Sequence, residues 1–432
     1  MKTIKKANEK ISAFIYTKNV AEKKLRDSTW TIAFSLNDVH LLKNTFSGEV
    51  VCLSDEEVAS LEKVEELKQH RFIVPLDYNE AEQYQQTIKL LKLMEPEEEG
   101  LKTYTILPTT ACNARCTYCY EEGYAVNTMT QATAERLVDF ICETRREGKI
   151  SLSWFGGEPL VGAGIIDYVC AELDKRKVDY KSGIITNASL FTPELVNKAK
   201  KDWKVERVQI SLDGDKTSYA ERKRYSNPEI YNYDAVMNAI HWLADEGIKV
   251  QLRVNFDKEN FMGLSGFIDE MEERFGKYDN VNLYLSLLFQ EQHKQDCMSV
   301  YEDMFNLYQE KKSYNVLKRI NIGKNFKANH CMADSLDKSI VIDPEGRFFN
   351  CEHLPGNDNT WGNIFDGVTD KAKFDKLLEP AEIEEECKTC PFLPECTPFY
   401  RKHCPDHFDY CREYRTLKTE YELRRIAETL QS

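Results

Sequence analysis

The sequence predicts an α/β protein in which a partial (β/α)6 barrel lies between a smaller N-terminal domain and a cysteine-rich C-terminal domain. Three observations lead to this prediction. Six strand-like stretches alternate with helical ones from Lys102 onward. The residues before Lys102 form a separate pattern of short strands and helices. The segment from Cys331 to the end holds seven of the 14 cysteines.

The composition limits the class of protein. At 432 residues the chain is too long for one simple core, and 42% hydrophobic with 30% charged residues is typical of a soluble globular protein. It has no apolar run of bilayer length and no signal-peptide core near the N-terminus, so we expect a cytoplasmic protein without a membrane partner. The net charge of −14 disfavours nucleic acid as a partner. Ten cysteines fall into two clusters with metal-type spacing, which favours metal binding over disulfides.

Residues 1–93 predict a small domain of strands followed by short helices. Strands are expected at residues 29–34, 48–53 and 72–75, and a helix from Asn79 to Leu93. Ser54 and Glu57 have the spacing of a capping box, which predicts a helix that continues through Leu61 and Val64. This order resembles the winged-helix-like module by which maturases of ribosomally made peptides capture a leader peptide as an added strand. A stabilising cap without a ligand is the alternative. Residues 94–101, rich in Glu with Pro96 and Gly100, indicate a linker.

The barrel is predicted over residues 102–320. The expected strands are 103–107, 150–155, 182–186, 207–212, 249–255 and 282–288, and the expected helices are 130–147, 165–175, 193–201, 234–246 and 261–275. Thr192 and Pro193 are a capping residue followed by proline at the first helical position. Strands that alternate with helices indicate parallel βα units, and six of them predict a partial barrel. Chemistry in such barrels lies where strands end and loops begin.

A loop with three cysteines follows the first barrel strand. Cys112, Cys116 and Cys119 are spaced by three and then two residues, so one tight loop can direct three sulfurs to one small cluster. Thiolates are the ligands that iron–sulfur clusters select, and three of them leave one iron of a four-iron cluster with an open coordination site. A zinc site or three unrelated buried thiols are the alternatives.

The second barrel strand ends in Gly156, Gly157, Glu158 and Pro159. Two glycines let a backbone pass close to a ligand, and a neighbouring carboxylate can bind an ammonium group. Together with Tyr118 before the last cysteine of the loop, this spacing resembles the radical S-adenosylmethionine enzymes. The resemblance implies that residues 156–159 bind the amino group of the cofactor's methionine.

Later strand ends supply further polar residues. By the same resemblance, contacts to the carboxylate and ribose of S-adenosyl-L-methionine are expected from Asn187 after Thr186, Ser211, Asp213, Arg222, Arg253 and Asn255. Lys223 and Arg224 adjoin Arg222, which leaves open which cation serves. No catalytic residue is predicted, and His241 is given no role.

The C-terminal cysteines form a second pattern. They are Cys331, Cys351, Cys387, Cys390, Cys396, Cys404 and Cys411. Residues 343–346 predict a turn between strands at 339–342 and 347–351. The C-x2-C-x5-C run that begins at Cys387, together with Gly346 before Cys351, resembles the SPASM domain. A zinc-binding C-terminal domain is the alternative.

The SPASM resemblance implies two auxiliary 4Fe-4S clusters. By this resemblance the inner cluster is held by Cys331, Cys351 and Cys404, and the outer cluster by Cys387, Cys390, Cys396 and Cys411. Seven residues separate Cys396 from Cys404 where the family usually has three, which leaves the assignment of Cys404 and Cys411 open. The inner cluster lacks a fourth thiolate, so either Cys297 supplies it or the iron stays open, for example to a substrate thiolate.

The combined resemblance, from Lys102 to Tyr414, implies a peptide maturase. The cofactors would be S-adenosyl-L-methionine and three 4Fe-4S clusters, and the partners a precursor peptide with a leader and an electron donor such as flavodoxin or ferredoxin. The implied reaction is hydrogen abstraction by a 5′-deoxyadenosyl radical, followed by a thioether or carbon–carbon cross-link. The alternatives are a formylglycine-forming enzyme like the anaerobic sulfatase maturases and a non-catalytic redox-sensing iron–sulfur protein. The expected domains end with SPASM at 321–414 and a helix at 415–432.

Overall fold

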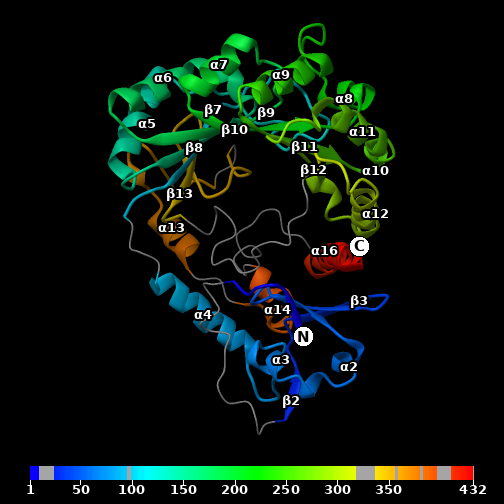
Figure 1. The fold of residues 1–432 in the computed structure, drawn as a ribbon. Coiled ribbons are helices and arrows are strands. Elements are labelled where there is room, and N and C mark those ends of the chain that lie inside the picture. The colour runs from blue at the N-terminus through cyan, green and yellow to red at the C-terminus, as the bar shows by residue number, and fades with distance from the viewer. Residues whose placement is uncertain are drawn as a thin grey trace. The chain divides into compact units, whose positions relative to one another are not determined.

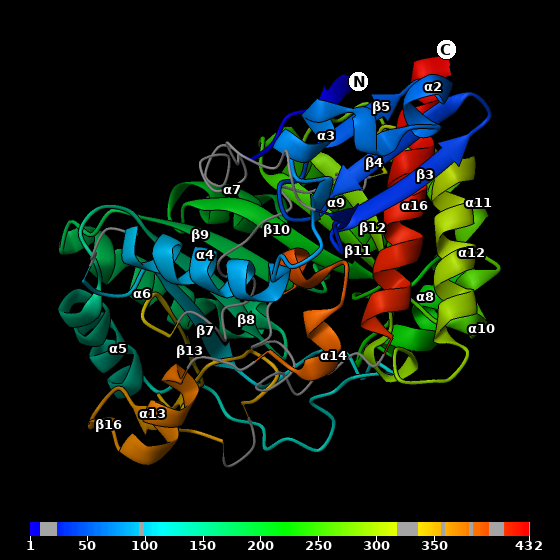
Figure 2. The ribbon, with the colours of Figure 1, turned by 90° about the horizontal axis from the view of Figure 1, so that it is seen from below.

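The computed structural model describes residues 1–8, 24–94, 99–317, 336–355, 359–379, 383–396 and 410–431 (Figures 1 and 2). These residues form two compact units. The first contains residues 1–94 and 383–431, and the second contains residues 99–317 and 336–379. Within the described ranges, no helix is both long enough and apolar enough to cross a membrane.

The second unit is built on the predicted parallel sheet. Its six sequential strands are β7 (Thr103–Thr109), β8 (Ile150–Gly156), β9 (Tyr180–Thr186), β10 (Val205–Leu212), β11 (Lys249–Phe256) and β12 (Val281–Leu287). Each strand pairs in parallel with the next one along the chain. The predicted α/β class and the six βα units are therefore confirmed. All six strands direct their carboxyl ends to one edge, where the three-cysteine loop leaves β7.

Helices cover one face of this sheet (Figure 1). They are α5 (Gln131–Thr144), α6 (Ala163–Lys175), α7 (Pro193–Lys201), α9 (Tyr233–Asp245) and α11 (Leu264–Phe275). Burial alternates along β8: Ile150, Leu152 and Trp154 are buried, whereas Ser151 and Ser153 are partly exposed. One face of β8 therefore belongs to the apolar core, and the other is polar and accessible.

Three helices of this unit were not predicted as they occur. Asp257 forms a capping box with Asn260, so the helix expected from Phe261 to Phe275 is preceded by the separate α10 (Lys258–Phe261). The helices α8 (Lys216–Lys223) and α12 (Cys297–Glu310) were missed. Because α8 is short and hydrophilic, its sequence carries little apolar periodicity.

The predicted hairpin after residue 338 is present and extends the barrel sheet. The strand β13 (Ser339–Ile342) pairs antiparallel with β14 (Phe348–Phe349) and parallel with β7. Gly346 has φ +81°, a left-handed conformation that glycine adopts without strain, and its N–H donates to the Asp343 carbonyl at 2.9 Å. Beyond it lie β15 (Gly362–Asn363), β16 (Gly367–Val368) and α13 (Lys371–Leu378).

The first unit contains an antiparallel sheet in the order β1 (Lys2–Lys5), β5 (Val50–Leu53), β4 (Val39–Asn44) and β3 (Thr31–Leu36). A second pair joins β2 (Leu25–Asp27) to β6 (Ile73–Pro75), and α4 spans Glu80–Met94. The capping box of Ser54 and Glu57 is confirmed. The helix predicted through Val64 is wrong: α2 (Asp55–Val58) ends early, and η1 (Leu61–Lys63) and α3 (Glu65–Gln69) follow. These breaks let Leu61, Val64 and Leu67 pack on the same core.

The end of the chain completes this unit. It contains α14 (Glu385–Lys388), η5 (Leu393–Glu395) and α16 (Cys411–Gln431), which begins four residues before the expected position 415. On α16, Leu423 and Ala427 pack against Val39, Leu41 and Val50. Leu393 packs with Trp30, Phe46 and Tyr84. Cys387, Cys390, Cys396 and Cys411 thus share a compact unit with the N-terminal sheet, whereas Cys351 belongs to the barrel unit.

Candidate active site

The three-cysteine loop is bound to the end of α8. The Arg115 N–H donates to the Lys223 carbonyl at 3.0 Å, and the Thr117 N–H donates to the Arg222 carbonyl at 3.0 Å. The last carbonyls of a helix have no partner within the helix, so the loop satisfies them. Since residues 115 and 117 flank Cys116, these bonds fix the backbone on both sides of that cysteine.

The surroundings of the three loop thiols favour their protonated form. All three are partly buried, and the Ala114 N–H donates to Cys112 Sγ at 3.4 Å. Burial raises the pKa of the Cys112 thiol to about 12, and burial also raises the pKa of Cys116 and Cys119. Thiolates at such positions require a compensating cation, which the iron ions of a cluster supply.

The two glycines after β8 allow two backbones to approach. A Cβ built at Gly156 would lie 2.3 Å from the Thr109 carbonyl oxygen, and one at Gly157 would lie 2.4 Å from that of Thr110 and 2.5 Å from that of Ala111. Glu158 N–H also donates to the Ala111 carbonyl at 2.8 Å. The close approach expected toward a ligand is thus made, in this structure, to the start of the cysteine loop.

The Glu158 side chain is fully buried and is held by the protein itself. Its carboxylate accepts the Leu160 N–H at 3.1 Å, the Thr186 hydroxyl at 2.6 Å and the Asn187 N–H at 2.7 Å. Burial raises the pKa of this carboxyl group to about 7, although these hydrogen bonds oppose the shift. The carboxylate that was expected to bind an ammonium group therefore joins the ends of β8 and β9.

Asn187 passes this connection to the cysteine loop. Its side-chain amide donates to Asn113 Oδ1 at 2.8 Å, and Asn113 Nδ2 donates to Ser189 Oγ at 2.9 Å. Asn187 Oδ1 accepts the Ser189 N–H at 3.0 Å. The expected cofactor residues 156–158 and 187 thus form one support for the loop that carries Cys112.

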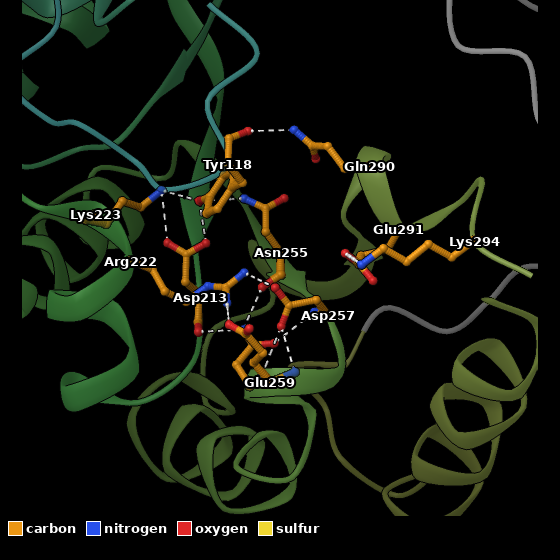
Figure 3. A network of polar contacts seen from close by, with 11 residues as sticks. Tyr118, Asp213, Arg222, Lys223, Asn255, Asp257, Glu259, Gln290, Glu291 and Lys294 are labelled. Carbon is orange, nitrogen blue, oxygen red and sulfur yellow. Dashed lines mark hydrogen bonds and ion pairs between the residues drawn. The ribbon is translucent and has the colours of Figure 1, made fainter. Parts of the chain in front are cut away.

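A second support surrounds the phenol of Tyr118 (Figure 3). The Tyr118 hydroxyl donates to Asp213 Oδ1 and accepts from Lys223 Nζ at 3.0 Å and from Asn255 Nδ2 at 3.2 Å. Lys223 Nζ also lies 3.1 Å from Asp213 Oδ2 and donates to Ser211 Oγ at 3.1 Å. Gln290 Nε2 donates to the Tyr118 carbonyl at 3.0 Å. The ends of β10 and β11, with α8, therefore converge on one loop residue.

Arg222 lies beside this group. Its guanidinium bonds Asp257 Oδ2 at 2.7 Å, and its Nε is buried without a hydrogen-bond partner among the described residues. Its charge lies 5.4 Å from the centre of the Tyr118 ring. Of the expected cofactor residues, Arg222 and Arg253 each have a buried Nε without a hydrogen-bond partner among the described residues. The sequence named Lys223 only as a neighbour that left the assignment of Arg222 open, and it did not single out Asn113 or Gln290, because their roles depend on contacts across distant parts of the chain.

Comparison with known proteins identifies one domain of this chain. The profile of the Radical SAM superfamily matches residues 106–272, from β7 into α11. These residues form a Radical SAM domain. The cysteine loop and the glycines after β8 lie at one edge of this domain. The residues that contact Tyr118 lie at the same edge, and among them only Gln290 falls outside residues 106–272.

Relatives of the domain have various activities. The Fe-coproporphyrin III synthase of Methanosarcina barkeri is 25% identical over 165 residues, which cover 38% of this chain and 39% of that protein. Among solved structures, native anSMEcpe with bound AdoMet has a TM-score of 0.60 at 16% identity, covering 76% of this chain and 100% of that one. SuiB of Streptococcus suis bound to precursor peptide SuiA has a TM-score of 0.52 at 16% identity, covering 89% and 98%.

These likenesses differ in what they establish. The chain spans about two-fifths of the length of the first curated relatives it matches, at 39% of each. The two solved structures are similar in fold. Residues 106–272 are thus a Radical SAM domain, whereas the cofactor, the reaction and the substrate of this chain are matters of proposal.

Several aromatic side chains lie close together next to the three-cysteine loop, in the same unit. The ring centres of Tyr120 and His353 are 4.9 Å apart, and Phe289 lies 6.4 Å from His353 and 5.2 Å from His293. His353 comes two residues after Cys351, which is buried. Cys351 is therefore brought into the neighbourhood of the loop that carries Cys119, through residues that the sequence did not indicate.

The other C-terminal cysteines have less complete surroundings. Cys331 and Cys404 lie outside the described residues. Cys387 N–H donates to the Glu384 carbonyl at 2.9 Å, and Cys390 N–H to the Cys387 carbonyl at 3.1 Å. Burial, with a smaller effect of Cys411, raises the pKa of the Cys390 thiol, which indicates that Cys390 and Cys411 are neighbours. Cys297 begins α12 and is 1% exposed, so it lies in the core of the barrel unit.

Proposed function

We propose that this chain is a radical S-adenosylmethionine maturase that forms a thioether or carbon–carbon cross-link in a ribosomally made precursor peptide. The observation that carries the proposal is a Radical SAM domain with a supported three-cysteine loop, on a chain that also contains an antiparallel sheet with an edge strand. The domain accounts for radical chemistry, and the edge strand offers a place for a peptide.

The cofactor would bind at the carboxyl edge of β7–β11. Cys112, Cys116 and Cys119 would hold a 4Fe-4S cluster, and the strand-end residues 156–159, 187, 211, 213, 222 and 255 would surround S-adenosylmethionine. Arg222 is suited to its carboxylate, since its Nε has no partner among the described residues. The bound cofactor and cluster supply a 5′-deoxyadenosyl radical that abstracts hydrogen from carbon. The chain's own contribution is to hold the loop and exclude water.

The peptide partner would dock on β3. Within the described residues, β3 pairs only with β4 and has a free edge. An edge strand presents unpaired N–H and C=O groups, which an extended peptide can bind as an added strand. The likeness to peptide-bound SuiB covers 89% of this chain, more than the 76% covered by anSMEcpe, and supports a peptide partner.

Two auxiliary 4Fe-4S clusters complete the proposal. Cys387, Cys390, Cys396 and Cys411 belong to one compact unit, which supports one cluster shared by these four cysteines. Cys351, with Cys331 and Cys404, would serve the other, and its fourth ligand is Cys297 or a substrate group. An electron donor such as flavodoxin or ferredoxin would reduce the enzyme.

The test uses the full-length protein, reconstituted with iron and sulfide without oxygen, and candidate precursor peptides taken from short reading frames that neighbour its gene. With S-adenosylmethionine and dithionite, we expect 5′-deoxyadenosine and a peptide that has lost two hydrogen atoms, with a cross-link located by tandem mass spectrometry. Formylglycine in place of a Cys or Ser would support the sulfatase-maturase alternative. Absence of 5′-deoxyadenosine would instead favour a redox-sensing protein.

A further inference from the structure

Lys223 and Asp213 form a buried ion pair next to the cysteine loop. Their side chains are 2% and 0% exposed, and Lys223 Nζ lies 3.1 Å from Asp213 Oδ2. Burial lowers the pKa of Lys223, but Asp213 and the surrounding acidic groups raise it well above its usual range. The ion pair therefore joins two side chains that are both almost fully buried.

The pair is attached to the loop on both sides of Cys116. The Lys223 carbonyl accepts the Arg115 N–H at 3.0 Å, and the Tyr118 hydroxyl lies between Lys223 Nζ and Asp213 Oδ1. Figure 3 shows Lys223, Asp213 and Tyr118 pointing toward one another from α8, β10 and the loop. Arg115, next to Cys116, contacts the backbone of Lys223, and Tyr118, two residues after Cys116, contacts both charged groups, so the pair lies close to the metal-binding loop.

Structural need alone does not explain two charges here. A buried ion pair gains little stability over apolar side chains, because removing both charges from water costs about as much as their attraction returns. A neutral hydrogen-bond partner would be sufficient to hold the Tyr118 hydroxyl. Charges beside an iron–sulfur cluster, however, change the energy of adding an electron, since burial in a low dielectric strengthens their effect.

We propose that Lys223 and Asp213 are positioning residues that set the electrostatic environment of Cys116 and thereby the reduction potential of the cluster held by Cys112, Cys116 and Cys119. Lys223 stabilises the added electron, and Asp213 opposes it. The inference rests on the proposed cluster and is independent of the peptide substrate. Its signature is that removing the positive charge of Lys223 lowers the reduction potential, whereas removing the negative charge of Asp213 raises it.

The experiment is a dithionite redox titration of the full-length, reconstituted protein, followed by electron paramagnetic resonance. The signal of this cluster is identified as the one missing from Cys116→Ala. We expect Lys223→Met to lower the potential, Asp213→Asn to raise it, and the double variant to return near the wild-type value. Lys223→Arg keeps the charge and should stay near wild type, and Tyr118→Phe, which removes no charge, should shift the potential least.

Each other outcome has a defined meaning. If Lys223→Met and Asp213→Asn shift the potential in the same direction, or not at all, the inference is overturned and the pair is structural only. If Lys223→Met fails to assemble the cluster, Asp213→Asn decides alone: an upward shift supports the inference, and any other result refutes it. Iron and sulfide analysis of the wild type separates this from the proposed function, which fails if the wild type holds no such cluster.

Discussion

Glu158 Oε2 accepts the backbone N–H of Asn187 at 2.7 Å and thereby ties the end of β8 to the end of β9. Both residues were expected to touch a cofactor. In the structure they form a chain of contacts from Glu158 through Asn187 to Asn113 in the cysteine loop. The strand ends thus build the rigid support that a metal loop requires before any ligand binds.

Replacing Glu158 should therefore destabilise the barrel unit. Glu158→Gln places an amide donor against at least one of three donors and leaves that donor unsatisfied, which costs about 1–3 kcal/mol. Urea unfolding followed by circular dichroism measures the loss. Glu206→Gln is the matched control, since Glu206 is exposed and its ion pair with Lys181 spans 4.0 Å. Equal stability of both variants would show that the buried contacts are unimportant.

Gly157→Ala should reduce the amount of metal that the protein binds while the barrel still folds. The added Cβ would meet the carbonyl oxygens of Thr110 and Ala111 at 2.4 and 2.5 Å, so the start of the cysteine loop must move. We expect a folded barrel with markedly less iron per protein after reconstitution. Gly164→Ala, in α6 with no atom near its Cβ, should retain the iron and gain about 0.5–1 kcal/mol of stability. Normal iron content in Gly157→Ala would contradict this role of the glycine.

The proposed docking edge can be tested without disturbing the β3–β4 pairing. β3 and β4 are joined by a two-residue hairpin that Leu36 and Val39 close. Every second residue of β3 then directs its backbone N–H and C=O toward β4, and these residues include Ile32 and Phe34. The backbone N–H of Ala33, which lies between them, therefore points away from β4. Ala33→Pro removes that donor and should weaken leader binding at least tenfold in fluorescence anisotropy. Ala33→Thr keeps the donor and should bind as wild type does. Unchanged affinity of the proline variant would place the leader elsewhere.

Glu422 should make the stability of the first unit depend on pH. It lies 3.6 Å from Lys43 Nζ, and burial raises its pKa from 4.5 to about 7, although Lys43 opposes the shift. The folded state then binds the proton more tightly than the unfolded state, so the free energy of unfolding falls as pH rises from about 4.5 to about 7.

Glu422→Gln removes this dependence. Between pH 5 and pH 8 the variant should lose about 2 kcal/mol less stability than the wild type. Lys43 keeps a partner, because Glu395 lies 3.0 Å away. Urea unfolding at the two pH values measures the difference, with the exposed Glu420→Gln on the same helix as control. Parallel pH profiles for wild type and Glu422→Gln would refute the assignment.

Sequence patterns predicted the strands and helices of the barrel well, because these elements depend on residues that are close together in the chain. The predicted cap at Thr192 and the six predicted strands depend on neighbours in sequence, and all are present. The pairing of β13 with β7 was not predictable, since no local signal links strands so far apart. The same holds for α16, which covers the N-terminal sheet.

The site shows the same division. The cysteine spacing indicated the three-cysteine loop as a candidate site, and the two glycines indicated the carboxyl end of β8. Lys223 was considered only as an alternative to Arg222 and was given no role of its own, because α8 is hydrophilic, which is typical of a surface helix. In the folded chain Lys223 donates a hydrogen bond to Tyr118 and forms an ion pair with Asp213, and its side chain is buried. The sequence of α8 alone does not indicate these contacts. Residues that act through distant contacts are therefore the ones that sequence patterns miss.

The most direct test of the account is production of 5′-deoxyadenosine by anaerobically reconstituted protein with S-adenosylmethionine and dithionite. The wild type should form it, and a variant with Ala at positions 112, 116 and 119 should form none while its circular dichroism stays native. Formation of 5′-deoxyadenosine by the triple variant, or zinc rather than iron and sulfide in the wild type, would contradict the account.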